Sequence, residues 1–236
     1  MTTLTAAPLS WAMRNGTRRE HRAAEGSHFM TALLAGRVDG AGYAAYLRRL
    51  RTVYASIETA GRANSADPCV VAVLDPALER LDALDADVAF WAPGSATEGD
   101  SPMADLYAHR VRESAVWGGL FVAHHYTRYL GDLSGGQAIG RSLAREFDLD
   151  ESGKGLAFYA FPQIPRPQRY KEAYRARLDL LRLDAGARSR IVAEVKHAFD
   201  LNRALFAELD ETIRPAGQPL PSDPQRRVRV AGCRTD

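Results

Sequence analysis

Cysteine is scarce in this chain, which has only Cys69 and Cys233 among 236 residues. The two lie far apart, and neither belongs to a CxxC or CxxCH pattern. A disulfide framework, a zinc site and a covalently attached cofactor are therefore unsupported. Such a chain fits a reducing compartment.

Long apolar runs are also missing. No stretch approaches the length of a membrane span, and the N-terminus lacks the basic region and continuous apolar core of a signal peptide. The net charge of +2 gives no reason to expect nucleic-acid binding. We therefore expect a soluble, cytoplasmic protein with no membrane partner.

Lysine is the third scarce residue, because Lys154, Lys171 and Lys196 are the only ones. Arginine supplies the remaining positive charge. Its guanidinium is a fixed fork that pairs well with carboxylates and phosphates, so an anionic ligand is possible.

No segment shows the alternation of a β-strand, and apolar residues recur at helical spacing instead. The pattern predicts an all-α single domain at 9–214, with a flexible N-terminal arm at 1–8 and a disordered tail at 215–236. Ser10, Asp39 and Ser101 are expected to cap helices, and Pro76 to occupy the first turn of another. The expected helices cover about 10–25, 27–35, 39–64, 76–91, 101–114, 117–146, 168–183 and 187–212.

The segment TRYLGDLSGGQ, at 127–137, is the most informative motif. Glycine inside a helix costs up to about 1 kcal/mol relative to alanine. Gly131 and Gly135 lie four residues apart, so they share one face and leave it without side chains. We expect a bend there, with Asp132 placed to hold a polar network beside the bare face.

Other interpretations of this segment must be weighed. It is not a P-loop, because it lacks the GK[ST] ending. The Gly131-x-x-x-Gly135 spacing is formally that of a membrane dimer motif, but its surroundings are too polar. A close crossing of two helices remains open, although it does not explain the neighbouring Asp, Arg and Tyr residues.

A histidine on the first expected helix is the candidate metal ligand. His21 shares one helix face with Arg14, Arg18 and Glu25. Taken alone, His21 is more readily interpreted as a surface histidine on a basic helix. The adjacent His124 and His125 point about 100° apart on a helix, so they do not chelate one metal well.

Together these motifs resemble the haem oxygenase family. The distal-helix signature at 126–137 carries most of the resemblance, and His21, followed by Glu25 and Phe29-Met30, resembles the family's haem-binding start. Basic residues at 171 and 175 and the stretch at 155–162 also match in order and spacing.

The resemblance implies an all-α bundle in which haem b lies between a proximal and a distal helix. It also implies cleavage of haem at a meso carbon, the α-meso position, to biliverdin, carbon monoxide and ferrous iron. The reaction would use O2 and electrons from a separate ferredoxin- or flavin-type reductase. His21 would ligate the iron, with Glu25 orienting its ring. The implied catalytic residues are Tyr54, Arg128, Gly131, Asp132 and Gly135. The implied haem-binding residues are Arg14, Arg18, His21, Glu25, Tyr126, Lys171, Arg175, Phe199 and Asn202.

Three alternatives come from other classes. A non-catalytic haem-binding or haem-delivery protein could use the same fold. A thiaminase-like enzyme would need a nucleophilic cysteine in a central pocket, whereas Cys69 is expected in a loop. A purely structural helical protein would not bind haem at all.

Overall fold

The computed structural model describes residues 7–97, 99–149 and 153–213. Within these ranges the chain forms eleven α-helices and no strand, which confirms the all-α prediction. The expected N-terminal arm falls mainly, and the C-terminal tail wholly, outside the described residues. Among the residues that the structure covers, no helix combines the length and apolar character needed to cross a membrane.

The N-terminal helix is broken, and the prediction of one helix over 10–25 was wrong. Helix α1 (Leu9–Gly16) ends where the hydroxyl of Thr17 donates to the carbonyl of Met13 at 2.7 Å, and α2 (Arg18–Glu25) follows at once. A Cβ atom at Gly16 would lie only 2.8 Å from Val192, so this glycine permits close packing on α11. Packing between distant segments thus ends α1.

Ser10 does not cap α1, contrary to expectation. Its backbone N–H and its hydroxyl both donate to the carboxylate of Asp179, each at 2.8 Å. These bonds fasten α1 to the end of α10 (Pro167–Asp179), which is shorter than the expected helix at 168–183.

The middle of the chain begins with α3 (His28–Leu34) and α4 (Gly40–Ala63). Asp39 caps α4 as expected, accepting from the backbone N–H of Gly42 at 2.8 Å. Cys69 does not lie in a loop, because Pro68–Val71 forms the short α5. The expected helix from Pro76 was also wrong, since Pro76–Leu78 is a 3₁₀ turn.

Helix α6 (Leu81–Trp91) begins after that turn, and a residue of α4 determines where it starts. The buried carboxylate of Glu58, on α4, accepts from the backbone N–H groups of Arg80 at 2.6 Å and Leu81 at 3.1 Å. It satisfies N–H groups that have no partner within a first helical turn.

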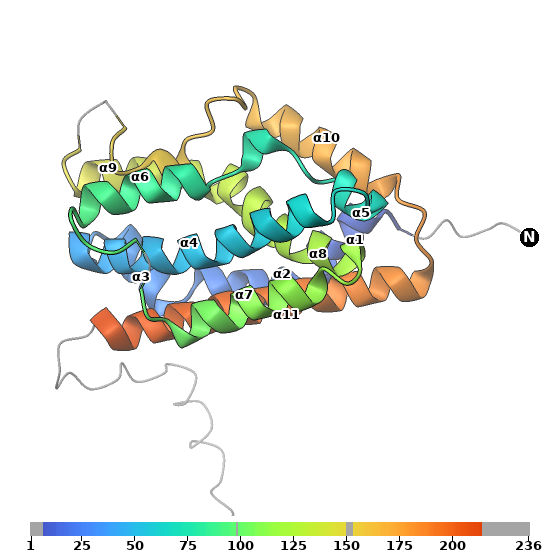
Figure 1. Cartoon of the computed structure of the whole chain (residues 1–236), viewed down its shortest axis with the longest axis horizontal. Helices are drawn as coiled ribbons and strands as arrows, with labels where there is room; N and C mark the ends of the chain where they lie inside the picture. The colour runs from blue at the N-terminus through green and yellow to red at the C-terminus, as the bar shows by residue number, and fades with distance from the viewer. Residues whose placement is uncertain (1–6, 98, 150–152, 214–236) are drawn as a thin grey trace, which may run out of the picture.

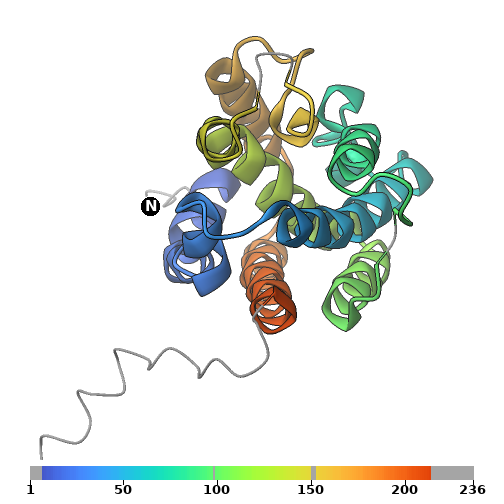
Figure 2. The same cartoon turned by 90° about the vertical axis from the view of Figure 1, so that its left-hand side faces the viewer.

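The long helices form the body of the molecule (Figure 1). Helix α4 packs against α6 on one side and α7 (Pro102–Ser114) on the other. Ser101 caps α7 as expected, at 3.1 Å from the backbone N of Ala104. The last helix, α11 (Ala185–Ile213), contacts α1, α2, α3, α7 and α8. The end-on view shows the helices grouped around a common interior (Figure 2).

The expected helix at 117–146 is not a uniform α-helix. It begins as α8 (Gly118–His125) and ends as α9 (Gln137–Glu146). Between them, Tyr126–Leu130 and Asp132–Gly136 are π-helical. We call residues 126–136 the glycine segment. Wide π-turns are rare and occur frequently at functional sites. They interrupt the α-helix at the glycines, where a bend was expected, and the bend itself stays a prediction.

Candidate functional site

His21 projects from the exposed face of α2, with 51% of its side chain accessible. Its Nδ1 lies 3.2 Å from Oε2 of Glu25, one turn later. Its ring packs edge-on against Phe199 of α11, with centroids 5.5 Å apart. Because Glu25 engages Nδ1 and Phe199 holds the ring, Nε2 is the nitrogen left to ligate a metal.

The glycine segment presents a bare surface. Gly131 and Gly135 are exposed, and a Cβ atom built on either meets no described atom within 4 Å. The backbone at Gly131 is α-helical, with φ −60° and ψ −51°. No backbone strain therefore requires a glycine at position 131, and the missing side chain leaves space for something else.

Directly beside this surface lies a buried polar cluster. The Tyr54 hydroxyl donates to the Asp132 carboxylate, and Arg128 Nε donates to the Tyr54 oxygen at 3.2 Å. Arg128 Nη1 donates to Asn202 Oδ1 at 2.6 Å, while its Nη2 lies 4.0 Å from Asp132 Oδ1. The cluster thus joins α4, the glycine segment and α11.

The environment of Asp132 suits proton exchange. Burial raises the pKa of its carboxyl, although the Arg128 charge and the Tyr54 hydrogen bond lower that pKa in part. A raised pKa allows a carboxyl group to hold and release a proton nearer neutrality.

Cationic side chains gather at one edge of the glycine segment. Lys171 Nζ donates to Ser134 Oγ at 3.3 Å. Burial raises the pKa of Tyr126, while the charges of Arg175 and Arg14 lower it, so both guanidinium groups act on this phenol. Arg175 Nε is buried with no acceptor among the described residues, which marks it as a donor available to an anionic ligand.

Arg14 and Arg18 were expected on one face of one helix, and this was wrong. The break at Thr17 puts Arg14 in the last turn of α1 and Arg18 at the start of α2. Both side chains are exposed, and of the two only Arg14 is among the charges that lower the pKa of Tyr126.

The two adjacent histidines are held in separate hydrogen bonds. His124 Nε2 lies 2.9 Å from Oε1 of Glu194, and His125 Nδ1 lies 2.9 Å from the hydroxyl of Tyr174. Both rings are buried, and burial lowers the pKa of His125 to about 3. They tie α8 to α11 and α10 rather than to a common ligand.

Two tyrosines near the polar cluster were missed. Tyr46 and Tyr107 are buried, and burial raises the pKa of each while the Arg128 charge lowers it. Tyr46 could have been found, because it lies eight residues before Tyr54 on the same helix. Tyr107 reaches the cluster from α7, and no local pattern signals that.

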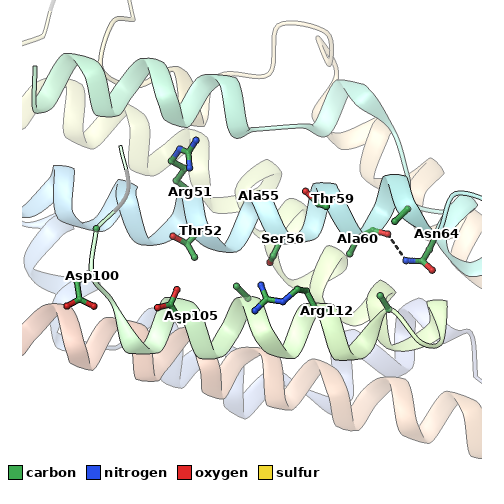
Figure 3. Close-up of a pocket in the computed structure, with 14 residues that line it drawn as sticks. Arg51, Thr52, Ala55, Ser56, Thr59, Ala60, Asn64, Asp100, Asp105 and Arg112 are labelled. Atoms are coloured by element: carbon green, nitrogen blue, oxygen red, sulfur yellow. Dashed lines mark hydrogen bonds between the residues drawn. The ribbon is translucent and has the colours of Figure 1, made fainter. Parts of the chain in front are cut away.

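A wide groove of about 830 Å³ lies elsewhere, between α4 and α7 (Figure 3). Thr52 and Ser56 point from α4 toward it, with Asp105 and Arg112 on α7 opposite. No candidate site residue is among the described residues that line it.

The chain is similar in sequence to known heme oxygenases. The family model described as heme oxygenase matches residues 7–208. The chain is 37% identical to heme oxygenase 1 of Homo sapiens, over 87% of this chain and 73% of the relative. It is 35% identical to heme oxygenase 1 of Nostoc sp., over 95% of both proteins.

Solved structures give the same result. The crystal structure of heme oxygenase-2 from Synechocystis sp., in complex with heme and NO, matches with a TM-score of 0.83 at 34% identity. That match covers 88% of this chain and 87% of the other. The heme oxygenase of Leptospira interrogans matches with a TM-score of 0.81 at 35% identity, over 85% of this chain and 99% of the other.

Proposed function

The chain belongs to the haem oxygenase family of enzymes, and we propose on that basis that it opens haem b at one meso carbon. The products would be biliverdin, carbon monoxide and ferrous iron. The observation that carries the proposal is the bare face of Gly131 and Gly135 beside the buried Asp132 cluster. A flat substrate needs such a face, and its oxidation needs a proton donor next to it.

Haem fits the residues present. Its iron needs one neutral imidazole, which His21 offers through Nε2. Its two carboxylates need cationic partners, and Arg14, Lys171 and Arg175, which gather at one edge of the glycine segment, would supply them. The buried Nε of Arg175, without an acceptor among the described residues, is a donor that a carboxylate would satisfy. Arg18 is proposed as a further cation.

Each protein group then has a distinct task. When bound, haem supplies the iron at which O2 is reduced. Asp132 holds and delivers a proton beside the bare face, through a bridging water where the gap requires one. Tyr54 and Arg128 fix the Asp132 carboxylate, and Asn202 fixes Arg128.

The protein also determines which carbon reacts. Cations at one edge of the glycine segment would hold the carboxylates of haem, and the backbone of Gly131 and Gly135 would limit where the substrate can lie. We propose α-meso cleavage on this basis. Electrons would come from a separate ferredoxin- or flavin-type reductase, drawn to the basic edge.

A haemin titration followed by turnover tests the function. The wild type should form a 1:1 complex with a Soret band, which decays in ascorbate and air as biliverdin accumulates. A stable Soret band would instead identify a haem carrier, and no band would indicate a purely structural protein.

The ligand assignment has a matched control. His21→Ala should lose the wild-type Soret spectrum, and added imidazole should restore it by occupying the vacated position. His109→Ala removes another exposed histidine, on α7, and should leave the spectrum unchanged. An unchanged spectrum in His21→Ala would overturn the assignment.

A further inference from the structure

Asp87, on α6, is a buried carboxylate that lies outside the polar cluster around Asp132. Its side chain is fully buried, and both carboxylate oxygens are used. Oδ1 accepts from the backbone N–H of Ala157 and Oδ2 from that of Phe158, each at 2.8 Å. These N–H groups open the short 3₁₀ turn at Ala157–Tyr159, which we call the aromatic turn.

The aromatic turn packs against the site through its two rings. The ring of Phe158 meets Tyr54 edge-on, with centroids 5.4 Å apart. Tyr159 also lies against two further glycines, Gly136 of the glycine segment and Gly140 of α9. A Cβ atom would lie 3.1 Å from Tyr159 Cδ1 at Gly136, and 3.0 Å from Tyr159 Cβ at Gly140.

The glycines of the glycine segment and α9 therefore serve two purposes. Gly136 and Gly140 admit the aromatic turn, whereas Gly131 and Gly135 face open space. Two π-helical stretches in close succession are rare, so we expect the glycine segment to depend on the elements that pack against it. The aromatic turn supplies that support, because Tyr159 packs against Gly136 and Gly140.

We propose that Asp87 is a positioning residue for the glycine segment. By holding the backbone of the aromatic turn, it fixes the Gly131–Gly135 face and the Tyr54–Asp132 pair. Any effect of Asp87 on ring cleavage rests on the proposed function. The claim that Asp87 holds the glycine segment in place concerns the protein without haem.

Hydrogen exchange of the haem-free full chain, followed by mass spectrometry, tests this claim. In Asp87→Asn, the amide NH₂ faces a backbone N–H, so one of the two bonds is lost. We expect at least tenfold faster exchange at 131–140 as well as at 157–159. Faster exchange at 157–159 alone, or a uniform increase over the chain, would overturn the proposal.

Glu208→Gln is the matched control. Glu208 is a partly buried carboxylate that also accepts from a backbone N–H, that of Met103 at 2.9 Å, as well as from the Ser101 hydroxyl and from Arg49 Nε at 2.8 Å. It joins α11 to the start of α7, away from the aromatic turn. This variant should lower stability without faster exchange at 131–140.

A second variant covers the case in which Asp87→Asn does not fold. Gly140→Ala places a methyl group against Tyr159 and displaces the aromatic turn from the opposite side. It should produce the same local increase in exchange, and an unchanged rate at 131–136 would overturn the proposal.

With haem and a reductant, either variant should bind haem within a few-fold of wild type yet give mixed biliverdin isomers. A single isomer, identical to that of the wild type, would contradict the positioning role, and a wild type without turnover would refute only the proposed function.

Discussion

Replacing Gly131 by alanine should raise the stability of the haem-free protein and lower its affinity for haem. Alanine adopts the backbone angles of Gly131 without strain, and its methyl group meets no described atom within 4 Å. The replacement should therefore stabilise the haem-free protein by up to about 1 kcal/mol through helix propensity. For a chain of this size, that corresponds to a rise in Tm of roughly 2–4 °C.

The same methyl group would project from the face proposed to lie against haem. Forcing a methyl group into a packed contact costs about 1–3 kcal/mol. Haem affinity should therefore fall roughly 5- to 150-fold, and biliverdin formation should fall with it.

Thermal unfolding by circular dichroism and haemin titration together measure both effects. Gly140→Ala is the contrast, because its methyl group would meet Tyr159 and should lower stability. If Gly131→Ala raises Tm and leaves haem affinity and turnover unchanged, the bare face is not the substrate surface.

Three further predictions concern buried polar groups. Asp132→Ala should bind haem normally but lose at least ten-fold in biliverdin yield and oxidise peroxidase substrates instead. A normal biliverdin yield would refute the assignment of Asp132 as the proton donor. Tyr54→Phe removes the donor to buried Asp132 and should lower the free energy of unfolding by about 1–3 kcal/mol in urea. Tyr43→Phe should cost less, because the buried Tyr43 hydroxyl faces at most the hydroxyl of Tyr159 and no described carboxylate accepts from it; equal losses would refute the contrast. His125 has a pKa lowered from 6.5 to about 3, so the unfolded chain binds the proton first and stability falls as pH drops from about 6.5 toward 3. Against His125→Phe, wild type should lose about 2 kcal/mol more between pH 7 and pH 5 in denaturant titrations, and equal losses would contradict this.

Local chemistry explains which parts of the fold were predicted correctly. Asp39 and Ser101 accept hydrogen bonds from N–H groups three residues away, so the sequence alone predicts the starts of α4 and α7. The break at Thr17 and the start of α6 were missed for the opposite reason. The break at Thr17 depends on the close packing of Gly16 on Val192. The start of α6 depends on the Glu58 carboxylate, which accepts from the backbone N–H of Leu81.

The candidate site divides in the same way. The motif itself predicts the bare face and Asp132, because glycine spacing and an acidic neighbour are visible in the sequence. The bonds from Asp87 to the aromatic turn span seventy positions in the chain, so no local pattern reveals them. The site roles of His21 and the basic residues stay predictions until they are tested.

A single-turnover experiment tests the central claim most directly. The haem complex is given reductant in air, and carbon monoxide and biliverdin are measured against the haem consumed. The proposed reaction predicts one molecule of each per haem, because one meso carbon leaves as carbon monoxide and the ring opens once. Loss of haem without equivalent carbon monoxide, or a haem complex that persists unchanged, would contradict it.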